Sequence, residues 1–330
     1  MNNFSILIRI TLFILALAGC SQGSYKGTES APGPASGAGA VWRIAPAGDL
    51  NGFFNCLEDN GLSLISAHRA GRYPGYPENA LDTAQYVSAQ IPAIYEIDVA
   101  TSRDGVLFLM HDDRLERTTT GTGLVKEVDW SAIKSLKLED DDGTVTAFNP
   151  PTLRAFLRWA KPRTLVQIDF KRSTRFEDVV DLVAREGMQD RVIYIAYTLA
   201  QARKLHQLAP DAMISVSVDT ISELNAVTAA GIPADRLLAF TGTRDPKPRL
   251  FRFLGQQDVE VIFGTLGGRD ALDKEIARTG DNSLYTELSR QGVDILATDR
   301  PLEAHAALAA IGRVATDGGA GRAICGISKS

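Results

Sequence analysis

Residues 93–111, Ala93-Ile-Tyr-Glu-Ile-Asp-Val-Ala-Thr-Ser-Arg-Asp-Gly-Val-Leu-Phe-Leu-Met-His111, decide the fold. Two apolar, β-branched runs, 93–99 and 106–110, flank a short link that contains Asp104-Gly105. Parallel strands need a crossover of roughly a dozen residues or more, whereas Asp-Gly is typical of a hairpin turn. The second run is therefore predicted to fold back antiparallel on the first.

The position of the turn sets the register of this hairpin. A turn centred between residues 103 and 104, or between 104 and 105, makes the numbers of paired residues sum to 207 or 209. These registers place His111 opposite Glu96 or Asp98, respectively. An imidazole and a carboxylate are therefore expected at the same end of the sheet.

Apolar runs of the same kind recur along the chain and alternate with helical stretches, which is typical of βαβ units and a parallel sheet. Without the returning run 106–110, eight parallel strands remain. We therefore predict one (β/α)₈ TIM-type barrel over residues 46–330, with a β-hairpin extension on its second strand. The expected strands are 62–67, 93–99, 106–110, 164–170, 191–196, 213–217, 236–241, 259–264 and 293–298. The expected helices are 78–89, 152–160, 175–186, 198–208, 221–230, 282–291 and 301–312.

The N-terminus reads as a targeting segment rather than as part of the fold. The apolar run 6–18 is short for a membrane span and is typical of a secretory signal peptide over residues 1–19. It leads into Leu17-Ala-Gly-Cys20, which resembles a bacterial lipobox with Cys20 as the lipidated residue. The alternative is a plain signal peptide and an incidental cysteine.

Residues 20–45 are rich in Gly, Ser, Ala and Pro, which predicts a flexible tether. We expect an exported protein that a lipid anchors to a bacterial membrane. In a cell with two membranes, Ser21 after the lipidated cysteine favours the outer membrane, facing the periplasm. The formal charge of −5 and the lack of a Lys/Arg run argue against nucleic acid as a partner.

Two further cysteines, Cys56 and Cys325, remain in the chain. An exported protein with two such cysteines favours a disulfide. One lies just before the first barrel strand and the other close to the C-terminus, and these regions are neighbours in a closed barrel. We predict the bridge Cys56–Cys325, with two buried thiols as the alternative.

Acidic residues recur at spacing two on two of the expected strands. Glu96 and Asp98 share one face of their strand because side chains alternate with period two. Asp169 and Lys171 repeat the spacing on the run 164–170. Crowded carboxylates repel one another unless a cation or a proton lies between them. A hard divalent cation, Mg²⁺ or Ca²⁺, fits such oxygen ligands.

Two histidines follow apolar runs directly, in His68-Arg69 and His111-Asp112. The ordinary pKa of imidazole is near neutrality, so one ring can accept a proton while the other donates one. The guanidinium of Arg69 suits a phosphate group. Glu78-Asn79 is expected to open a helix and to cap it.

These residues together resemble the glycerophosphodiester phosphodiesterase family. The matching segments, in the order of the family, are His68-Arg69 with Pro77-Glu78-Asn79, Glu96-Ile-Asp98-Val99, Asp104-Gly105 with His111-Asp112, Arg117-Thr118-Thr119 with Gly121-Thr122-Gly123, Asp169-Phe-Lys171, and 292–301 with Asp299. The sequence departs from the family at Asp169, where glutamate is usual.

The resemblance implies a barrel with its site at the C-terminal ends of the strands. It also implies metal-dependent hydrolysis of a glycerophosphodiester to glycerol 3-phosphate and an alcohol. By this resemblance, the divalent cation is held by Glu96, Asp98 and Asp169. His68 and His111 form the acid/base pair, and Arg69 and Lys171 bind the phosphoryl oxygens.

Two other functions remain open. One is a lysophospholipase D-like or other phosphodiesterase reaction on the same fold. The other is a binding lipoprotein without catalysis. A protein that only binds needs no acid/base pair, so the presence of both histidines favours an enzyme.

Overall fold

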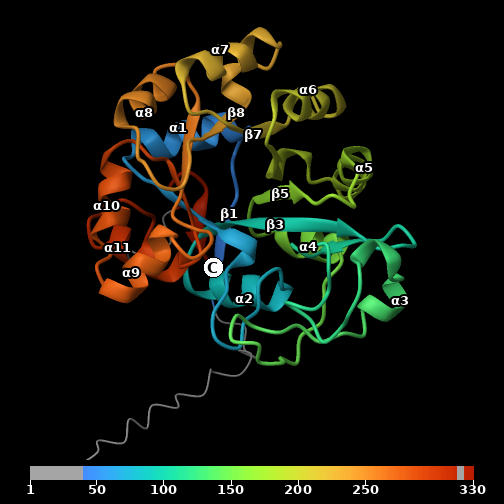
Figure 1. The fold of residues 1–330 in the computed structure, drawn as a ribbon. Coiled ribbons are helices and arrows are strands. Elements are labelled where there is room, and N and C mark those ends of the chain that lie inside the picture. The colour runs from blue at the N-terminus through green and yellow to red at the C-terminus, as the bar shows by residue number, and fades with distance from the viewer. Residues whose placement is uncertain (1–39, 318–322) are drawn as a thin grey trace, which may run out of the picture. The chain divides into compact units, whose positions relative to one another are not determined.

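The predicted eight-stranded parallel barrel is confirmed by the computed structural model, which describes residues 40–317 and 323–330 (Figure 1). The strands β2 and β3 also pair with each other, which closes the sheet into a ring. In their order around the ring, the strands are β2 (Leu64–Ala67), β3 (Ala93–Thr101), β5 (Val166–Phe170), β6 (Val192–Ala196), β7 (Met213–Ser217), β8 (Leu237–Phe240), β9 (Glu260–Gly264) and β10 (Ile295–Thr298).

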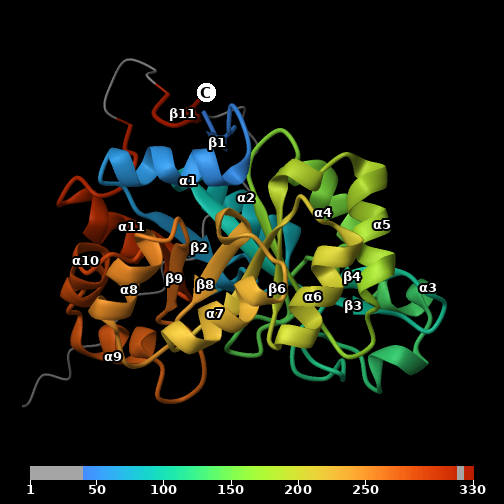
Figure 2. The same cartoon turned by 90° about the horizontal axis from the view of Figure 1, so that it is seen from above.

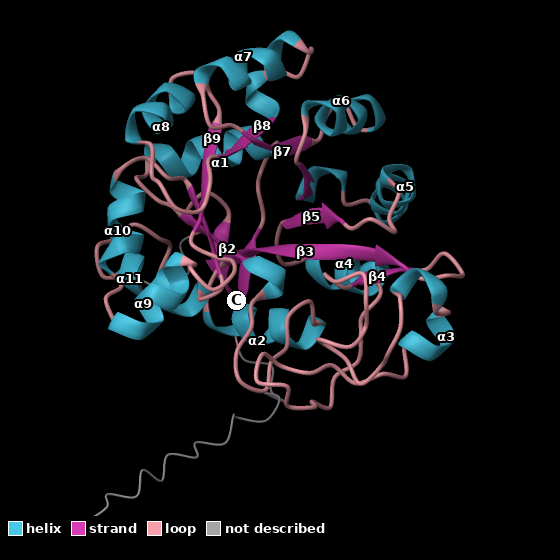
Figure 3. Cartoon of the chain, in the orientation of Figure 1, coloured by secondary structure: helices cyan, strands magenta, loops and turns pink. Residues whose placement is uncertain are grey.

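Helices surround the strands (Figure 3). They are α2 (Leu81–Gln90), α4 (Leu153–Ala160), α5 (Phe176–Glu186), α6 (Leu199–Leu208), α7 (Ile221–Ala229), α8 (Pro248–Gly255), α9 (Leu272–Thr279), α10 (Ser283–Arg290) and α11 (Pro301–Ala309), with the short α3 (Trp130–Ile133) beside the hairpin. In α4, the buried residues Leu153, Phe156, Leu157 and Ala160 recur at helical spacing and form one apolar face. The side chain of Thr152 caps its first turn by accepting from the Ala155 N–H.

The N-terminal end of the barrel is filled by apolar side chains. One cluster joins inward-facing residues of the strands, such as Ile193, Met213 and Ile295, to Phe53 and Phe54 of the helix α1. The helix α1 (Leu50–Asp59) lies beside the small antiparallel sheet of β1 (Trp42–Ile44) and β11 (Ile327–Lys329) (Figure 2). These apolar side chains close the N-terminal end of the barrel.

The strand β4 (Leu107–Leu109) pairs antiparallel with β3, and the hairpin register differs from both predicted registers. Thr101 lies opposite Leu107 and Val99 lies opposite Leu109, so paired numbers sum to 208 rather than 207 or 209. Because the sum is even, the loop between the paired residues has an odd number of residues. Gly105 lies in this loop with φ +85°, a left-handed conformation that favours glycine. Because β4 ends at Leu109, His111 lies beyond the strand rather than in a cross-strand pair.

The predicted tether over 20–45 is wrong at its C-terminal end. Residues Trp42–Ile44 form β1, and the side chains of Trp42 and Ile44 are buried. A disulfide joins Cys56 of α1 to Cys325, just before β11. The expected signal peptide, Cys20 and the tether up to residue 39 lie outside the described residues. Within 40–317 and 323–330, no helix has the length and apolar character that a membrane crossing requires.

Candidate active site

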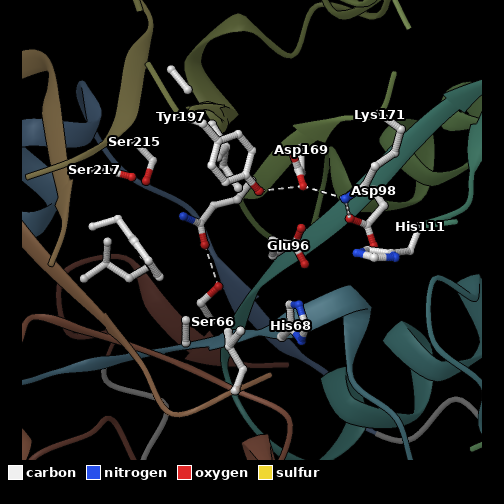
Figure 4. A pocket seen from close by; sticks show the side chains of 17 residues that line it. Ser66, His68, Glu96, Asp98, His111, Asp169, Lys171, Tyr197, Ser215 and Ser217 are labelled. Atoms are coloured by element: carbon white, nitrogen blue, oxygen red, sulfur yellow. Dashed lines mark hydrogen bonds and ion pairs between the residues drawn. The ribbon is translucent and has the colours of Figure 1, made fainter. Parts of the chain in front are cut away.

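One cavity at the C-terminal end of the barrel collects six of the residues singled out in the sequence (Figure 4). They come from β3, from the end of β5 and the residue after it, and from the segments that follow β2 and β4. They are His68, Glu96, Asp98, His111, Asp169 and Lys171. Because parallel strands all end on the same side of a barrel, residues distant in sequence converge here.

Three carboxylates form the centre of this site. Glu96, Asp98 and Asp169 are buried, and each offers an oxygen within 4.8 Å of the others. The in-register pairing of β3 with β5 places Asp98 directly beside Asp169. Burial, followed by the negative charge of Asp98, raises the pKa of Glu96 to about 8. Such an all-oxygen cluster fits a hard divalent cation, which would relieve this repulsion.

The ammonium group of Lys171 lies between two of the carboxylates. Its Nζ is 2.5 Å from Asp98 Oδ1 and 2.7 Å from Asp169 Oδ2. Burial raises the pKa of Asp98, but the charges of Lys171 and Arg69 outweigh this effect and the pKa lies below its ordinary value. Lys171 and Arg69 place two positive charges beside three carboxylates, so a cluster with all three ionised keeps negative charge that a divalent ion would neutralise.

His68 is held by a buried carboxylate. Its Nδ1 lies 2.6 Å from Asp299 Oδ1, and Arg72 Nη2 lies 2.5 Å from Asp299 Oδ2. Burial lowers the pKa of His68, but the hydrogen bond to Asp299 and the nearby negative charges outweigh it, so the pKa is raised. With Nδ1 engaged by the carboxylate, Nε2 is the nitrogen left for substrate.

His111 has the same kind of support on the other side of the cavity. Its Nδ1 lies 2.6 Å from Asp112 Oδ1, and Arg117 Nε donates to Asp112 Oδ2 at 2.6 Å. The hydrogen bond from Arg117 holds the pKa of Asp112 well below its ordinary value. The side chain of His111 is 35% exposed and that of His68 is 13% exposed, so His111 is the more accessible of the two rings.

The comparison with known proteins decides the family. The sequence model of the Glycerophosphoryl diester phosphodiesterase family matches residues 68–303, which include both imidazoles and all three carboxylates. The chain belongs to this family. Its membership indicates that the protein is a phosphoric diester hydrolase.

Known proteins match this chain over different lengths. A glycerophosphodiester phosphodiesterase of Bacillus altitudinis is 28% identical over 174 residues, 49% of this chain and 69% of the relative. An uncharacterized protein of Bacillus subtilis is 32% identical over 157 residues, 45% of this chain and 64% of the relative. The crystal structure of a glycerophosphoryl diester phosphodiesterase from Parabacteroides distasonis matches with a TM-score of 0.76 and 28% identity, over 88% of this chain and 99% of that one.

Two residues that the sequence assigned to helix capping instead support the site. The helix α2 begins at Leu81, and no side chain caps it. Asn79 Nδ2 donates to Asp98 Oδ2 at 2.7 Å, and its Oδ1 accepts from the Asp98 N–H at 3.0 Å. Glu78 lies between Arg69 and Arg117, with contacts of 3.0 and 2.7 Å. The capping interpretation is therefore wrong, because both side chains turn toward the ends of the strands.

Arg69 lies beside the cavity rather than among the residues that line it. Its side chain contacts Glu78, its Nε is 3.5 Å from Asp98 Oδ2, and its backbone N–H donates to Glu96 Oε2 at 2.7 Å. The structure thus shows Arg69 as a support of the carboxylates, and its contact with phosphoryl oxygen stays a prediction.

Sequence reasoning assigned no role to Asp299, Arg117 or Tyr197. Asp299 directly follows an apolar run, as His68 does, so its position in the sequence could have indicated a site residue. Tyr197 follows β6, and its hydroxyl donates to Asp169 Oδ2 at 2.8 Å. No sequence pattern distinguishes this tyrosine from other aromatic residues.

Proposed function

We propose that this protein hydrolyses glycerophosphodiesters to glycerol 3-phosphate and an alcohol, using a divalent cation held by Glu96, Asp98 and Asp169. One observation carries the proposal: two imidazoles, each held through Nδ1 by a carboxylate, share a cavity with the three-carboxylate cluster. A phosphodiesterase of Oleispira antarctica has the same fold, with a TM-score of 0.61 and 19% identity, and its structure contains the product sn-glycerol-3-phosphate. That relative supports a small-molecule substrate.

The residues of the cavity divide the chemistry among them. When bound, the cation would polarise a phosphoryl oxygen and stabilise the charge that develops on it. One of His68 and His111 accepts the proton of the attacking oxygen, and the other protonates the departing alkoxide. Lys171 places a positive charge in the cavity for the phosphoryl oxygens, and Tyr197 holds Asp169 in place.

A second candidate is a lysophospholipase D-like reaction, and exposed apolar side chains favour it. Tyr197 and Leu199 follow β6, and Ile221 begins α7, so all three lie at the same end of the barrel as the cavity. Their exposed fractions are 59%, 37% and 45%. Such side chains could contact the acyl chain of a lipid substrate while its phosphate occupies the cavity. A binding protein without catalysis accounts for neither supported imidazole.

The proposed location is outside the cytoplasm, on a membrane, through a lipid on Cys20. The disulfide Cys56–Cys325 supports an exported protein, because such bonds persist in oxidising compartments. A Cys20→Ser chain is expected in the soluble fraction of the periplasm. Membrane association that is unchanged by this substitution would exclude the lipid anchor.

The decisive experiment is a panel of phosphodiesters assayed for release of glycerol 3-phosphate with Mg²⁺ or Ca²⁺. Water-soluble glycerophosphodiesters are expected to be hydrolysed faster than lysophospholipids, and the reverse order would favour the second candidate. His111→Ala should lower kcat by about 10²-fold or more, as expected for a lost general acid or base. A wild-type protein without activity on the whole panel, or an unchanged rate in this variant, would contradict the proposal.

A further inference from the structure

The cavity continues below the catalytic side chains into the interior of the barrel. Ser66 precedes His68 by two residues on β2, and Gln167 precedes Asp169 by two residues on β5. Alternate residues of a strand face the same side, so Ser66 and Gln167 lie one layer deeper than the catalytic groups. Ser215 of β7 lines the same cavity from across the barrel (Figure 4).

This deeper layer presents hydrogen-bonding groups to the cavity. Gln167 is 1% exposed, and its Oε1 accepts from the Ser66 hydroxyl at 2.5 Å. Gln167 and Ser215 both line the cavity, and within the described part of the chain the Gln167 Nε2 group and the Ser215 hydroxyl are not among the fully buried polar groups that lack a partner. An amide and a hydroxyl that line a cavity offer it hydrogen-bond donors and acceptors, so this layer suits a polar ligand.

The rest of the deep cavity is apolar. Phe240, Ile262 and Ala297, from β8, β9 and β10, line it. The cavity measures about 150 Å³. A space of this size accepts a short carbon chain with hydroxyl groups.

We propose that Gln167 and Ser215 form a polyol subsite that binds the hydroxyl groups of a three-carbon alcohol in the substrate. Gln167 Nε2 donates to one hydroxyl oxygen, and the Ser215 hydroxyl donates to or accepts from a second one. Ser66 is a positioning residue, because its bond to Oε1 turns the Nε2 group of Gln167 toward the cavity. The carbon chain packs against the apolar wall. This subsite rests on the proposed hydrolysis of glycerophosphodiesters.

The alcohol bound there is either the glycerol that stays on the phosphate or the alcohol that leaves. Two pairs of substrates distinguish these sources. In the first pair, the phosphate carries ethanolamine together with either glycerol or propanol. In the second pair, glycerol 3-phosphate is esterified with either glycerol or propanol. The kcat/KM ratio within each pair measures how far the enzyme recognises the missing hydroxyl groups.

The wild type is expected to prefer the fully hydroxylated substrate in one pair. Gln167→Leu and Ser215→Ala should each reduce that preference by roughly fivefold, the value of one neutral hydrogen bond. Their kcat/KM on the deoxygenated substrate should change little. Gln167→Met serves as the second variant if the leucine variant does not fold. Ser88→Ala, a buried serine of α2 outside the cavity lining, is the matched control and should leave both ratios unchanged.

The possible failures can be told apart. If the variants slow both members of each pair equally, or leave both ratios at the wild-type values, the deep groups have a structural role or bind water only, and the subsite is refuted. If the wild type releases product from neither pair, the proposed function fails, and the subsite fails with it.

Discussion

Asp299→Asn should separate the position of His68 from its charge. Asparagine has the shape of aspartate, and the backbone N–H of residue 299 keeps its bond to Asp273 Oδ2 at 2.7 Å. The substitution removes the negative charge that lies 2.6 Å from His68 Nδ1. It also leaves Arg72 without the carboxylate that accepts from it at 2.5 Å. The ring of His68 therefore keeps its place but loses the charge-assisted hydrogen bond at Nδ1.

The size of the effect follows from the bond that is lost. A hydrogen bond to a charged group contributes about 1.5–3 kcal/mol, and about 1.4 kcal/mol corresponds to a factor of ten in rate. The value of kcat/KM should therefore fall roughly tenfold to a hundredfold. The bond to Asp299 raises the pKa of His68 against the opposite effect of burial, so the variant should lower this pKa.

The assay is the pH dependence of kcat/KM for the wild type and for Asp299→Asn. If His68 is the base, the acidic limb of the profile should move to lower pH; if it is the acid, the alkaline limb should do so. Asp141→Asn is the matched control, because Asp141 contacts Arg72 at 3.4 Å and its side chain is 53% exposed. If both limbs of the profile stay at their wild-type pH and the rate stays near that of the control, the role of Asp299 is refuted.

Two further predictions concern stability. Burial, followed by the charge of Asp294, raises the pKa of Glu260 to about 9 from an ordinary value of 4.5, so the folded protein loses stability as the pH rises between these values. Glu260→Gln should therefore raise the free energy of urea unfolding by up to about 3 kcal/mol at pH 7, with no gain below pH ~4; an equal gain at both pH values would contradict this reasoning. Replacing Cys56 and Cys325 together with serine should lower the free energy of unfolding by about 2–5 kcal/mol and leave kcat unchanged, since the bridge involves α1 at the far end of the barrel. Equal unfolding midpoints with and without the bridge would argue against its role.

The barrel could be predicted from sequence because its strands are apolar runs that end in polar residues. The helix α4 could be found because its buried residues recur at helical spacing. The helix α1 was missed because Gly52 and two asparagines weaken its helical pattern. The helix α9 (Leu272–Thr279) was missed because only two of its residues, Asp273 and Ile276, are buried. The hairpin was expected from Asp104-Gly105, but this dipeptide does not determine the length of its loop.

The site could be predicted only in part. The meeting of the carboxylates of β3 and β5 could be predicted, because strand spacing and the common direction of the strands bring them together. The partners of the imidazoles could not be predicted, because they depend on tertiary contacts. His68 and Asp299 are 231 residues apart in the chain and meet only because β2 and β10 are neighbours in the ring. Asn79 was assigned to the adjacent helix because its contact with Asp98 requires the loop to turn back.

Calorimetric titration of Mg²⁺ or Ca²⁺ into metal-stripped protein, with glycerol 3-phosphate release measured on the same samples, tests the metal site most directly. We expect saturable binding and activity that rises with occupancy. Binding should weaken in Asp169→Asn and stay unchanged in Asp113→Asn, whose side chain is half exposed. Full hydrolysis in excess EDTA, or wild-type metal affinity in Asp169→Asn, would contradict the assignment of Glu96, Asp98 and Asp169 as the ligands.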